Sequence, residues 1–182
     1  MLRIGVSRRG RPWQAEVLTK SINWFTDPDT DNRFLIDAAP GAGKTTRVPL
    51  ALLGEIAGTQ PLPGRSLMLE PRRLAARAAA TRLAVSLKEP LGERVGYSVR
   101  HEHKRSSRTR IEAMTDGLFL RRLQNDPELT GINCVIFDEF HERSRNSELA
   151  LALVREVQEL RRPDLCLLLM SATRALTNLR AQ

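Results

Sequence analysis

Short apolar runs alternate with longer segments of helical periodicity along most of this chain, and no other feature restricts its fold as strongly. The pattern predicts strands at residues 33–36, 66–70, 95–100, 109–114, 132–137 and 165–170, and helices at 45–56, 72–87, 116–125 and 147–160. Apolar strands separated by helices indicate an α/β fold, a mainly parallel sheet with helices on both faces. Ligands bind such sheets at the carboxyl ends of strands, so the residues that follow each strand are the candidates for chemistry.

The composition excludes several classes of protein. Of the 182 residues, 41% are hydrophobic and 27% are charged, which suits one folded domain rather than a disordered chain. The longest apolar run, 165–170, is far shorter than the ~20 residues of a membrane span, so no membrane partner is expected. Cys134 and Cys166 lie in apolar runs without metal-ligand spacing. They predict buried free thiols in a reducing compartment, and hence a cytoplasmic protein.

The chain is strongly basic. Its formal net charge is +8, and 25 of its 29 basic residues are arginines. This excess either favours polyanionic partners or reflects the codon bias of a GC-rich genome. Residues 1–32 are expected to form a basic, flexible lead-in, a helix at 12–25 and a turn-rich linker, and residues 33–182 to form the α/β domain.

A glycine-rich loop follows the first predicted strand and precedes the first predicted helix. It fits a phosphate-binding loop in which Ala38 replaces the usual first glycine, against the alternative of a glycine-rich turn with a solvated lysine. Gly41 and Gly43 let backbone N–H groups turn inward around a phosphate, and the helix N-terminus adds positive potential. Lys44 can reach the β- and γ-phosphates, and Thr45 offers a hydroxyl to Mg²⁺. The predicted nucleotide-binding residues are Pro40, Gly41, Ala42, Gly43, Lys44, Thr45 and Thr46.

Two adjacent acids end the apolar strand predicted at 132–137. Asp138 and Glu139 would hold Mg²⁺, partly through water, and Glu139 would also orient and deprotonate an attacking water. Taken alone, two acids after a strand are commonly a helix cap. Together with a phosphate loop earlier in the chain, they predict a nucleotide hydrolase.

These segments together resemble the motifs of superfamily 2 helicases. Residues 40–45, the run Asp138-Glu139-Phe140-His141 and the run Ser171-Ala172-Thr173 look like motifs I, II and III. The Asp-Glu-x-His form resembles the DEAH/RHA branch, and residues 70–77, 96–100 and 115–117 are similar to further motifs of that branch. Phe140 and the run 69–77 look most like the bacterial HrpB-type ATP-dependent helicases. The resemblance extends from residue 34 to residue 173.

The resemblance implies a RecA-like P-loop NTPase domain that uses ATP and Mg²⁺. It also implies binding of single-stranded nucleic acid, with RNA favoured over DNA as the substrate. Lys44, Asp138, Glu139 and His141 would act in catalysis. His141 would also connect the ATP site to Ser171 and Thr173, which would receive that coupling through their hydroxyl groups.

Five residues at strand ends are implied as nucleic-acid contacts: Arg72, Arg73, Arg100, Thr115 and Asp116. Arg72 and Arg73 follow a strand end and open a helix, where they can reach a nucleic-acid backbone. The alternative is that they solvate the start of the helix. Thr115 could donate to a phosphate, whereas Asp116 could equally cap the next helix. The basic stretch 94–110 is expected to be a solvated loop near the nucleic-acid groove.

The chain departs from the family after motif III. Arg174-Ala175 stand where leucine and an acidic residue are usual, and the sequence matches only the first of two RecA-like domains. The chain would be an excised domain, a truncated gene product or a natural half-protein. The second domain supplies an arginine finger worth about 10³–10⁵ in rate, so weak nucleotide binding and slow turnover are expected. Two alternatives stay open, another P-loop enzyme such as a nucleotide kinase, and a module that binds nucleotide or RNA without turnover.

Overall fold

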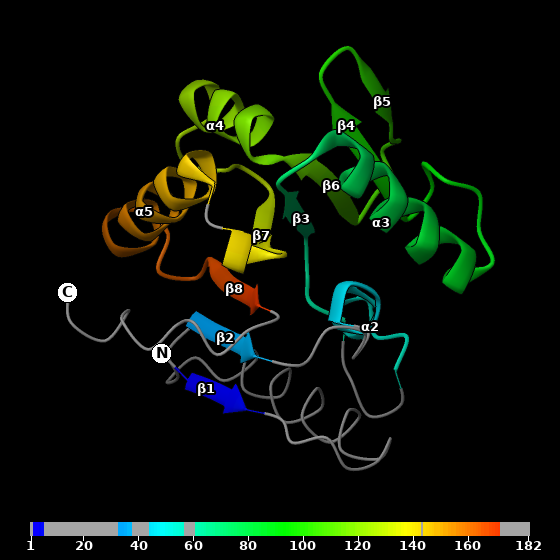
Figure 1. Ribbon diagram of the computed structural model, residues 1–182, viewed down its shortest axis with the longest axis horizontal. Helices are drawn as coiled ribbons and strands as arrows, with labels where there is room; N and C mark the ends of the chain where they lie inside the picture. Colours follow the sequence, from blue (N-terminus) through cyan, green and yellow to red (C-terminus); the bar gives the residue numbers. More distant parts are fainter. Residues whose placement is uncertain (1, 6–32, 38–43, 57–60, 143, 172–182) are drawn as a thin grey trace.

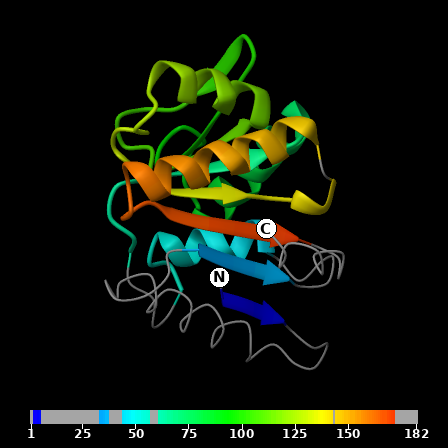
Figure 2. The ribbon, with the colours of Figure 1, turned by 90° about the vertical axis from the view of Figure 1, so that its left-hand side faces the viewer.

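One sheet organises the computed structural model, which describes residues 2–5, 33–37, 44–56, 61–142 and 144–171. Within these ranges, eight strands lie in the order β1-β2-β8-β7-β3-β6-β4-β5, and all are parallel except β5, which pairs antiparallel with β4 (Figures 1 and 2). The strands are β1 (Leu2–Gly5), β2 (Arg33–Asp37), β3 (Arg65–Glu70), β4 (Val95–Val99), β5 (Glu102–Lys104), β6 (Ile111–Thr115), β7 (Ile132–Phe137) and β8 (Cys166–Ser171). The helices are α2 (Lys44–Leu52), α3 (Arg73–Leu87), α4 (Asp116–Asn125), the 3₁₀ turn η1 (Phe140–Glu142) and α5 (Arg145–Leu160).

The strands and helices predicted from residue 33 onward are confirmed, with ends that shift by a few residues. The largest shift is at α2, which ends at Leu52 instead of residue 56. Gly54 follows in a left-handed conformation, with φ +77°, which stops the helix. The helix predicted at 12–25, the linker at 26–32 and the loop at 38–43 lie outside the described residues.

Two strands were not predicted. Leu2–Gly5 forms β1 and pairs in parallel with β2, so these residues belong to the sheet and the prediction of a flexible lead-in is wrong for them. Glu102–Lys104 forms β5 inside the stretch predicted as a basic loop. Both strands are short and lie at the edges of the sheet, where backbone hydrogen bonds suffice and no apolar run is needed.

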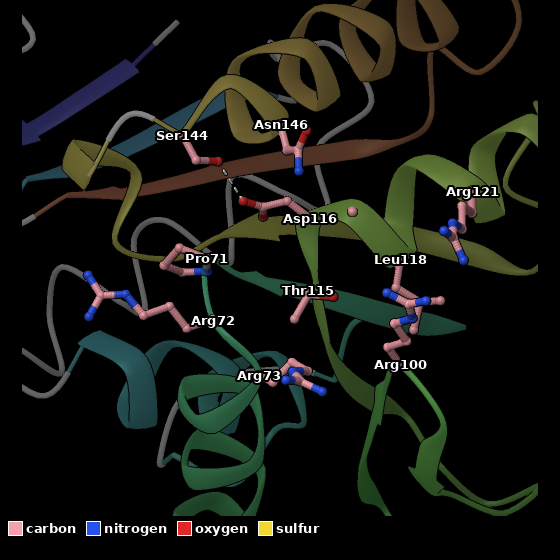
Figure 3. A pocket seen from close by; sticks show the side chains of 11 residues that line it. Pro71, Arg72, Arg73, Arg100, Thr115, Asp116, Leu118, Arg121, Ser144 and Asn146 are labelled. Atoms are coloured by element: carbon pink, nitrogen blue, oxygen red, sulfur yellow. Dashed lines mark hydrogen bonds between the residues drawn. The ribbon is translucent and has the colours of Figure 1, made fainter.

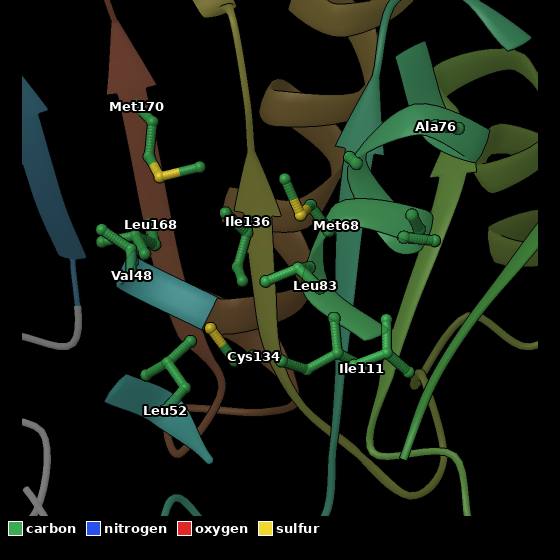
Figure 4. Packing of buried hydrophobic residues seen from close by; sticks show 14 of the residues in the cluster. Val48, Leu52, Met68, Ala76, Leu83, Ile111, Cys134, Ile136, Leu168 and Met170 are labelled. Atoms are coloured by element: carbon green, nitrogen blue, oxygen red, sulfur yellow. The ribbon is translucent and has the colours of Figure 1, made fainter. Parts of the chain in front are cut away.

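Alternate residues of the central strands feed two separate cores. Met68, Ile136 and Leu168 pack with α2 and α3 on one face (Figure 4). Their neighbours in the chain point to the other face and pack with α4 and α5; these are Leu67, Leu69, Val135, Phe137, Leu167 and Leu169. Because a strand alternates its side chains, an unbroken apolar run serves both layers, which confirms the prediction of helices on both faces.

The two cysteines lie side by side in the first of these cores. Cys134 on β7 and Cys166 on β8 are register partners with sulfur atoms 3.4 Å apart. Both are buried free thiols, as predicted. Burial raises the pKa of the Cys166 thiol well above its ordinary value, which keeps it protonated and unreactive. No helix in the described ranges is long and apolar enough to cross a bilayer.

The Arg162 side chain lies at the start of β7, at the edge of the sheet opposite to the strand ends that carry Asp138 and Thr115. Its guanidinium donates to both carboxylate oxygens of Asp164 at 2.8 and 2.7 Å. It also donates to the carbonyls of Glu128 at 2.9 Å and of Ile132 at 3.1 Å. One side chain therefore ties the connection after α4 to the connection after α5.

Replacing Arg162 with alanine is expected to lower the free energy of unfolding by about 2–4 kcal/mol, since several hydrogen bonds of a charged donor are lost together. Urea denaturation measures this change. Arg161→Ala is the matched control, because among the described residues Arg161 makes one exposed ion pair, to Glu128 at 3.6 Å. Its loss should cost less than about 1 kcal/mol. Equal losses in the two variants would contradict the role given to Arg162.

Candidate functional site

The parallel strands bring the predicted chemical residues to one edge of the sheet. Strands β2 and β8 align Asp37 with Ser171, and β3 and β6 align Glu70 with Thr115. Strand β7 lies between β8 and β3, so Asp138 follows its end in the middle of this edge. Seen along the edge, the order is therefore the end of β2, Ser171, Asp138, Glu70 and Thr115.

The described part of the predicted phosphate loop begins at Lys44, the first residue of α2. Thr45 and Thr46 are half-buried in the first turn of this helix. Pro40, Gly41, Ala42 and Gly43 lie outside the described residues. The N-terminus of α2 thus follows directly on the loop, as a phosphate-binding loop requires. The nucleotide-binding roles of these residues stay predictions.

Asp138 is held rigidly at the centre of the edge. It is buried, its N–H donates to the Leu69 carbonyl at 3.0 Å, and its Oδ1 accepts from the Glu139 N–H at 2.8 Å. Its other oxygen, Oδ2, is buried and receives no hydrogen bond from an N–H or hydroxyl group in the described part of the chain. A buried carboxylate oxygen that lacks a donor fits Mg²⁺, which prefers oxygen ligands.

Glu139 stands in a strained backbone conformation. Its φ is +48°, in the left-handed region that a non-glycine residue rarely adopts. The next residue, Phe140, anchors this segment, because its side chain is buried edge-to-face against Phe137 with ring centroids 5.9 Å apart. The turn that follows brings His141 Nε2 to 3.3 Å from Glu139 Oε2. The Glu139 carboxylate is partly exposed at this edge, where it can reach a water molecule.

Glu70 ends a predicted strand and opens the run 70–77, but the sequence analysis gave its side chain no chemical role. Only 2% of its surface is exposed, and its carboxyl lies close to the carboxyl of Asp138. Burial first, and then the negative charges of Asp138 and Glu139, raise the pKa of Glu70 to about 9. Glu70 therefore carries a proton at neutral pH and adds no second negative charge beside Asp138.

Ser171 is fully buried at the end of β8, and η1 packs near that strand. Thr173 lies outside the described residues. The coupling of His141 to Ser171 and Thr173 therefore stays a prediction.

A cavity of about 480 Å³ opens beside the acidic centre, between the starts of α3, α4 and α5 (Figure 3). It brings together all five residues predicted as nucleic-acid contacts, which are Arg72, Arg73, Arg100, Thr115 and Asp116. Three further polar residues line it that the sequence did not indicate, namely Arg121, Ser144 and Asn146. Within the described ranges, Arg73 and Arg121 have no carboxylate partner, so this cavity has a positive wall.

Asp116 positions two of the helix starts that line the cavity. It is buried, and its Oδ2 accepts hydrogen bonds from Ser144 Oγ at 3.0 Å and Ser147 Oγ at 2.6 Å. Burial raises the pKa of this carboxyl, and the two hydroxyls oppose that rise. Ser144 also caps α5 by accepting from the Ser147 N–H at 2.9 Å. Asp116 thus fixes the start of α4 against the start of α5.

The prediction of a solvated basic loop holds for residues 100–105, 107 and 108, which are exposed, but most arginines of the stretch 94–110 have specific partners. Arg94 pairs with Glu55 and Glu89, Arg105 with Glu112, and Arg108 with Glu93. Arg110 donates to the carbonyls of Gly64 and Leu62, both at 2.7 Å. These arginines hold the β4–β5 hairpin on the domain. Arg100 alone in this stretch lines the cavity, and its Nε contacts His101 Nε2 at 3.1 Å.

The sheet, its helices and the acidic pair after β7 define a RecA-like P-loop NTPase domain. The model of the DEAD/DEAH box helicase family matches residues 11–181, so the chain belongs to that family. It is 48% identical over 149 residues to the ATP-dependent RNA helicase HrpB of Escherichia coli (strain K12), an alignment that covers 82% of this chain and 18% of that protein. It is 40% identical over 151 residues to the DExH-box ATP-dependent RNA helicase DExH1 of Arabidopsis thaliana, covering 82% of this chain and 15% of that protein.

A solved structure shows the same fold. The crystal structure of the E. coli DEAH/RHA helicase HrpB superposes with a TM-score of 0.79 at 46% identity, over 88% of this chain and 20% of that one. The chain therefore spans about a fifth or less of the length of these relatives.

Proposed function

We propose that this chain is the first, ATP-binding RecA-like domain of a DEAH/RHA-type RNA helicase. One observation carries the proposal, the placing of an acidic centre and an arginine-lined cavity next to each other on the same edge of one sheet. The acidic centre suits hydrolysis of a nucleotide, and the cavity suits the backbone of a single strand. The names of the relatives support ATP as the nucleotide and RNA as the strand.

In the nucleotide half of this site, residues 40–46 would hold the phosphates of ATP. Asp138 and Thr45 would hold Mg²⁺, which would neutralise phosphate charge when bound. Glu139 would accept the proton of the attacking water, and its contact with His141 would orient the carboxylate. Protonated Glu70 would leave Asp138 as the charged carboxylate of this buried pair.

In the nucleic-acid half, Arg73, Arg100 and Arg121 would contact phosphates, together with Arg72 and the hydroxyl of Thr115. The start of α4 adds its N-terminal dipole to the same cavity. Asp116 is a positioning residue here rather than a contact, because it is buried and accepts two hydroxyl hydrogen bonds. Contacts of this kind give affinity with little choice of sequence.

Catalysis at full rate and unwinding would belong to a longer protein. The relatives are about five to seven times longer than the aligned segment, and a second RecA-like domain would supply the arginine finger. The buried free thiols of Cys134 and Cys166 support a reducing, cytoplasmic setting.

A salt series tests the nucleic-acid half. We expect the double variant Arg72→Ala/Arg73→Ala to bind a fluorescein-labelled oligouridylate more weakly, measured by fluorescence anisotropy. The slope of log affinity against log salt should flatten by about one unit per lost phosphate contact. The matched control is Arg155→Ala/Arg161→Ala. Arg155 lies in α5 and Arg161 directly follows that helix, and neither side chain lines the cavity. Equal slopes for the two double variants would refute the assigned cavity.

A further inference from the structure

An ion pair joins the arginine-lined cavity to the segment that carries Glu139. Arg72 Nη2 lies 2.9 Å from Glu142 Oε2. Arg72 is the N-cap residue of α3, and its carbonyl accepts from the Ala76 N–H at 3.1 Å. Glu142 ends η1, and its N–H donates to the Glu139 carbonyl at 2.9 Å. The pair therefore links two segments that are separated by 70 positions in the chain.

Arg72 is directed differently from the other arginines of the cavity. In Figure 3 its guanidinium extends to the side opposite Arg73, Arg100 and Arg121. Glu142 accounts for this direction, because it is the carboxylate that Arg72 contacts. Two of the other long basic chains, Arg73 and Arg121, have no carboxylate partner in the described part of the molecule.

The Arg72–Glu142 ion pair can open readily, which leaves each side chain able to take another partner. The Arg72 side chain is 73% exposed and the Glu142 side chain is 35% exposed, so separating them requires no rearrangement of the core. A phosphate offers the guanidinium the same kind of charged oxygen acceptor that Glu142 offers. A strand entering the cavity and Glu142 are therefore alternative partners of one guanidinium.

We infer that Glu142 competes with a nucleic-acid phosphate for the guanidinium of Arg72. This competition would set the affinity of the cavity for nucleic acid. The inference rests on the proposed function of the cavity. Without a strand, Glu142 holds Arg72 on the side of Glu139. When a strand binds, one of its phosphates replaces Glu142 as the partner of Arg72. Glu142 is thus a positioning residue, acting on nucleic acid through Arg72.

A double-mutant cycle tests this competition with the 182-residue chain and a fluorescein-labelled oligouridylate. The variants are Glu142→Gln, Arg72→Ala and the combination of both, with Glu148→Gln as the control for loss of a nearby exposed acid. We expect Glu142→Gln to bind roughly two- to fivefold more tightly than the parent, the range set by an exposed ion pair. In the Arg72→Ala background, the same change should leave the affinity unaltered. Thermal unfolding of each variant verifies that the fold is retained.

The outcomes separate the inference from the proposed function. Equal tightening by Glu142→Gln in both backgrounds, or equal tightening by Glu148→Gln, would show a general charge effect and overturn the competition. Weaker binding by Glu142→Gln would also overturn it, since Glu142 would then support the bound state. If Arg72→Ala weakens binding and Glu142→Gln changes nothing, the inference fails while the cavity assignment stands. If the parent binds no RNA, both fail.

Discussion

A Glu139→Gln variant is expected to hydrolyse ATP about 10²–10⁴-fold more slowly than the parent and to bind the nucleotide equally well, because the amide keeps the shape of the side chain and cannot accept a proton. The measurement needs a polypeptide that joins this chain to a second RecA-like domain, so that turnover is fast enough to follow. Phosphate release gives the rate, and titration with a fluorescent ATP analogue gives the affinity.

The backbone at Glu139 makes this substitution informative. Its φ of +48° is maintained by the surrounding structure, and glutamine has the same conformational preference there as glutamate. The Phe140 anchor and the turn to Glu142 should therefore be unchanged. Glu148→Gln, an exposed substitution in the first turn of α5, is the control and should leave the rate near that of the parent. Unchanged hydrolysis in Glu139→Gln would exclude this residue as the base that activates water.

Much of the fold could be predicted because its central strands are buried on both faces. A run such as 132–137 is almost entirely apolar on both faces until it reaches the edge where chemistry occurs, so both its position and its end can be predicted. The two strands that were missed, β1 and β5, are held at the edges by backbone hydrogen bonds. Edge pairing leaves little trace in the side-chain pattern, which is why these strands were not predicted.

The site was predictable where residues follow a strand directly, as Asp138 and Glu139 do. It was not predictable where the partner comes from another element. Arg94, for example, pairs with Glu55, which is 39 positions away. Local charge counting cannot reveal such a pair. Arg121, Ser144 and Asn146 were missed for a related reason, since only packing brings the starts of α4 and α5 to the same cavity.

Glu70 extends the same lesson, because its chemistry depends on the strand beside it. It ends β3 next to β7, which places its carboxyl against Asp138 in a buried setting. Two acids that are far apart in the sequence thus lie side by side in the structure, and their proximity raises the pKa of Glu70. No pattern within either segment expresses that relation.

Replacing Glu70 with glutamine is expected to remove a large part of the pH dependence of stability. The folded-state pKa of Glu70 is raised from 4.5 to about 9, so the folded protein holds this proton more tightly than the unfolded chain. Stability from this group is therefore fully present below pH 4.5 and is lost as the pH rises toward about 9. Within that window, the parent should lose up to about 1.4 kcal/mol of unfolding free energy per pH unit through this group.

The side-chain amide that Glu70→Gln introduces stays neutral beside Asp138 at every pH, so this variant should gain stability over the parent progressively as the pH increases. Urea denaturation from about pH 5 to about pH 9, in buffer with a chelator so that no metal binds Asp138, measures the difference in slope. Glu148→Gln again serves as the control, since an exposed acid should leave the slope of the parent unchanged. Parallel curves for Glu70→Gln and the parent would mean that Glu70 is ionised in the folded protein. The buried Asp138 carboxylate would then face a second negative charge in the folded protein.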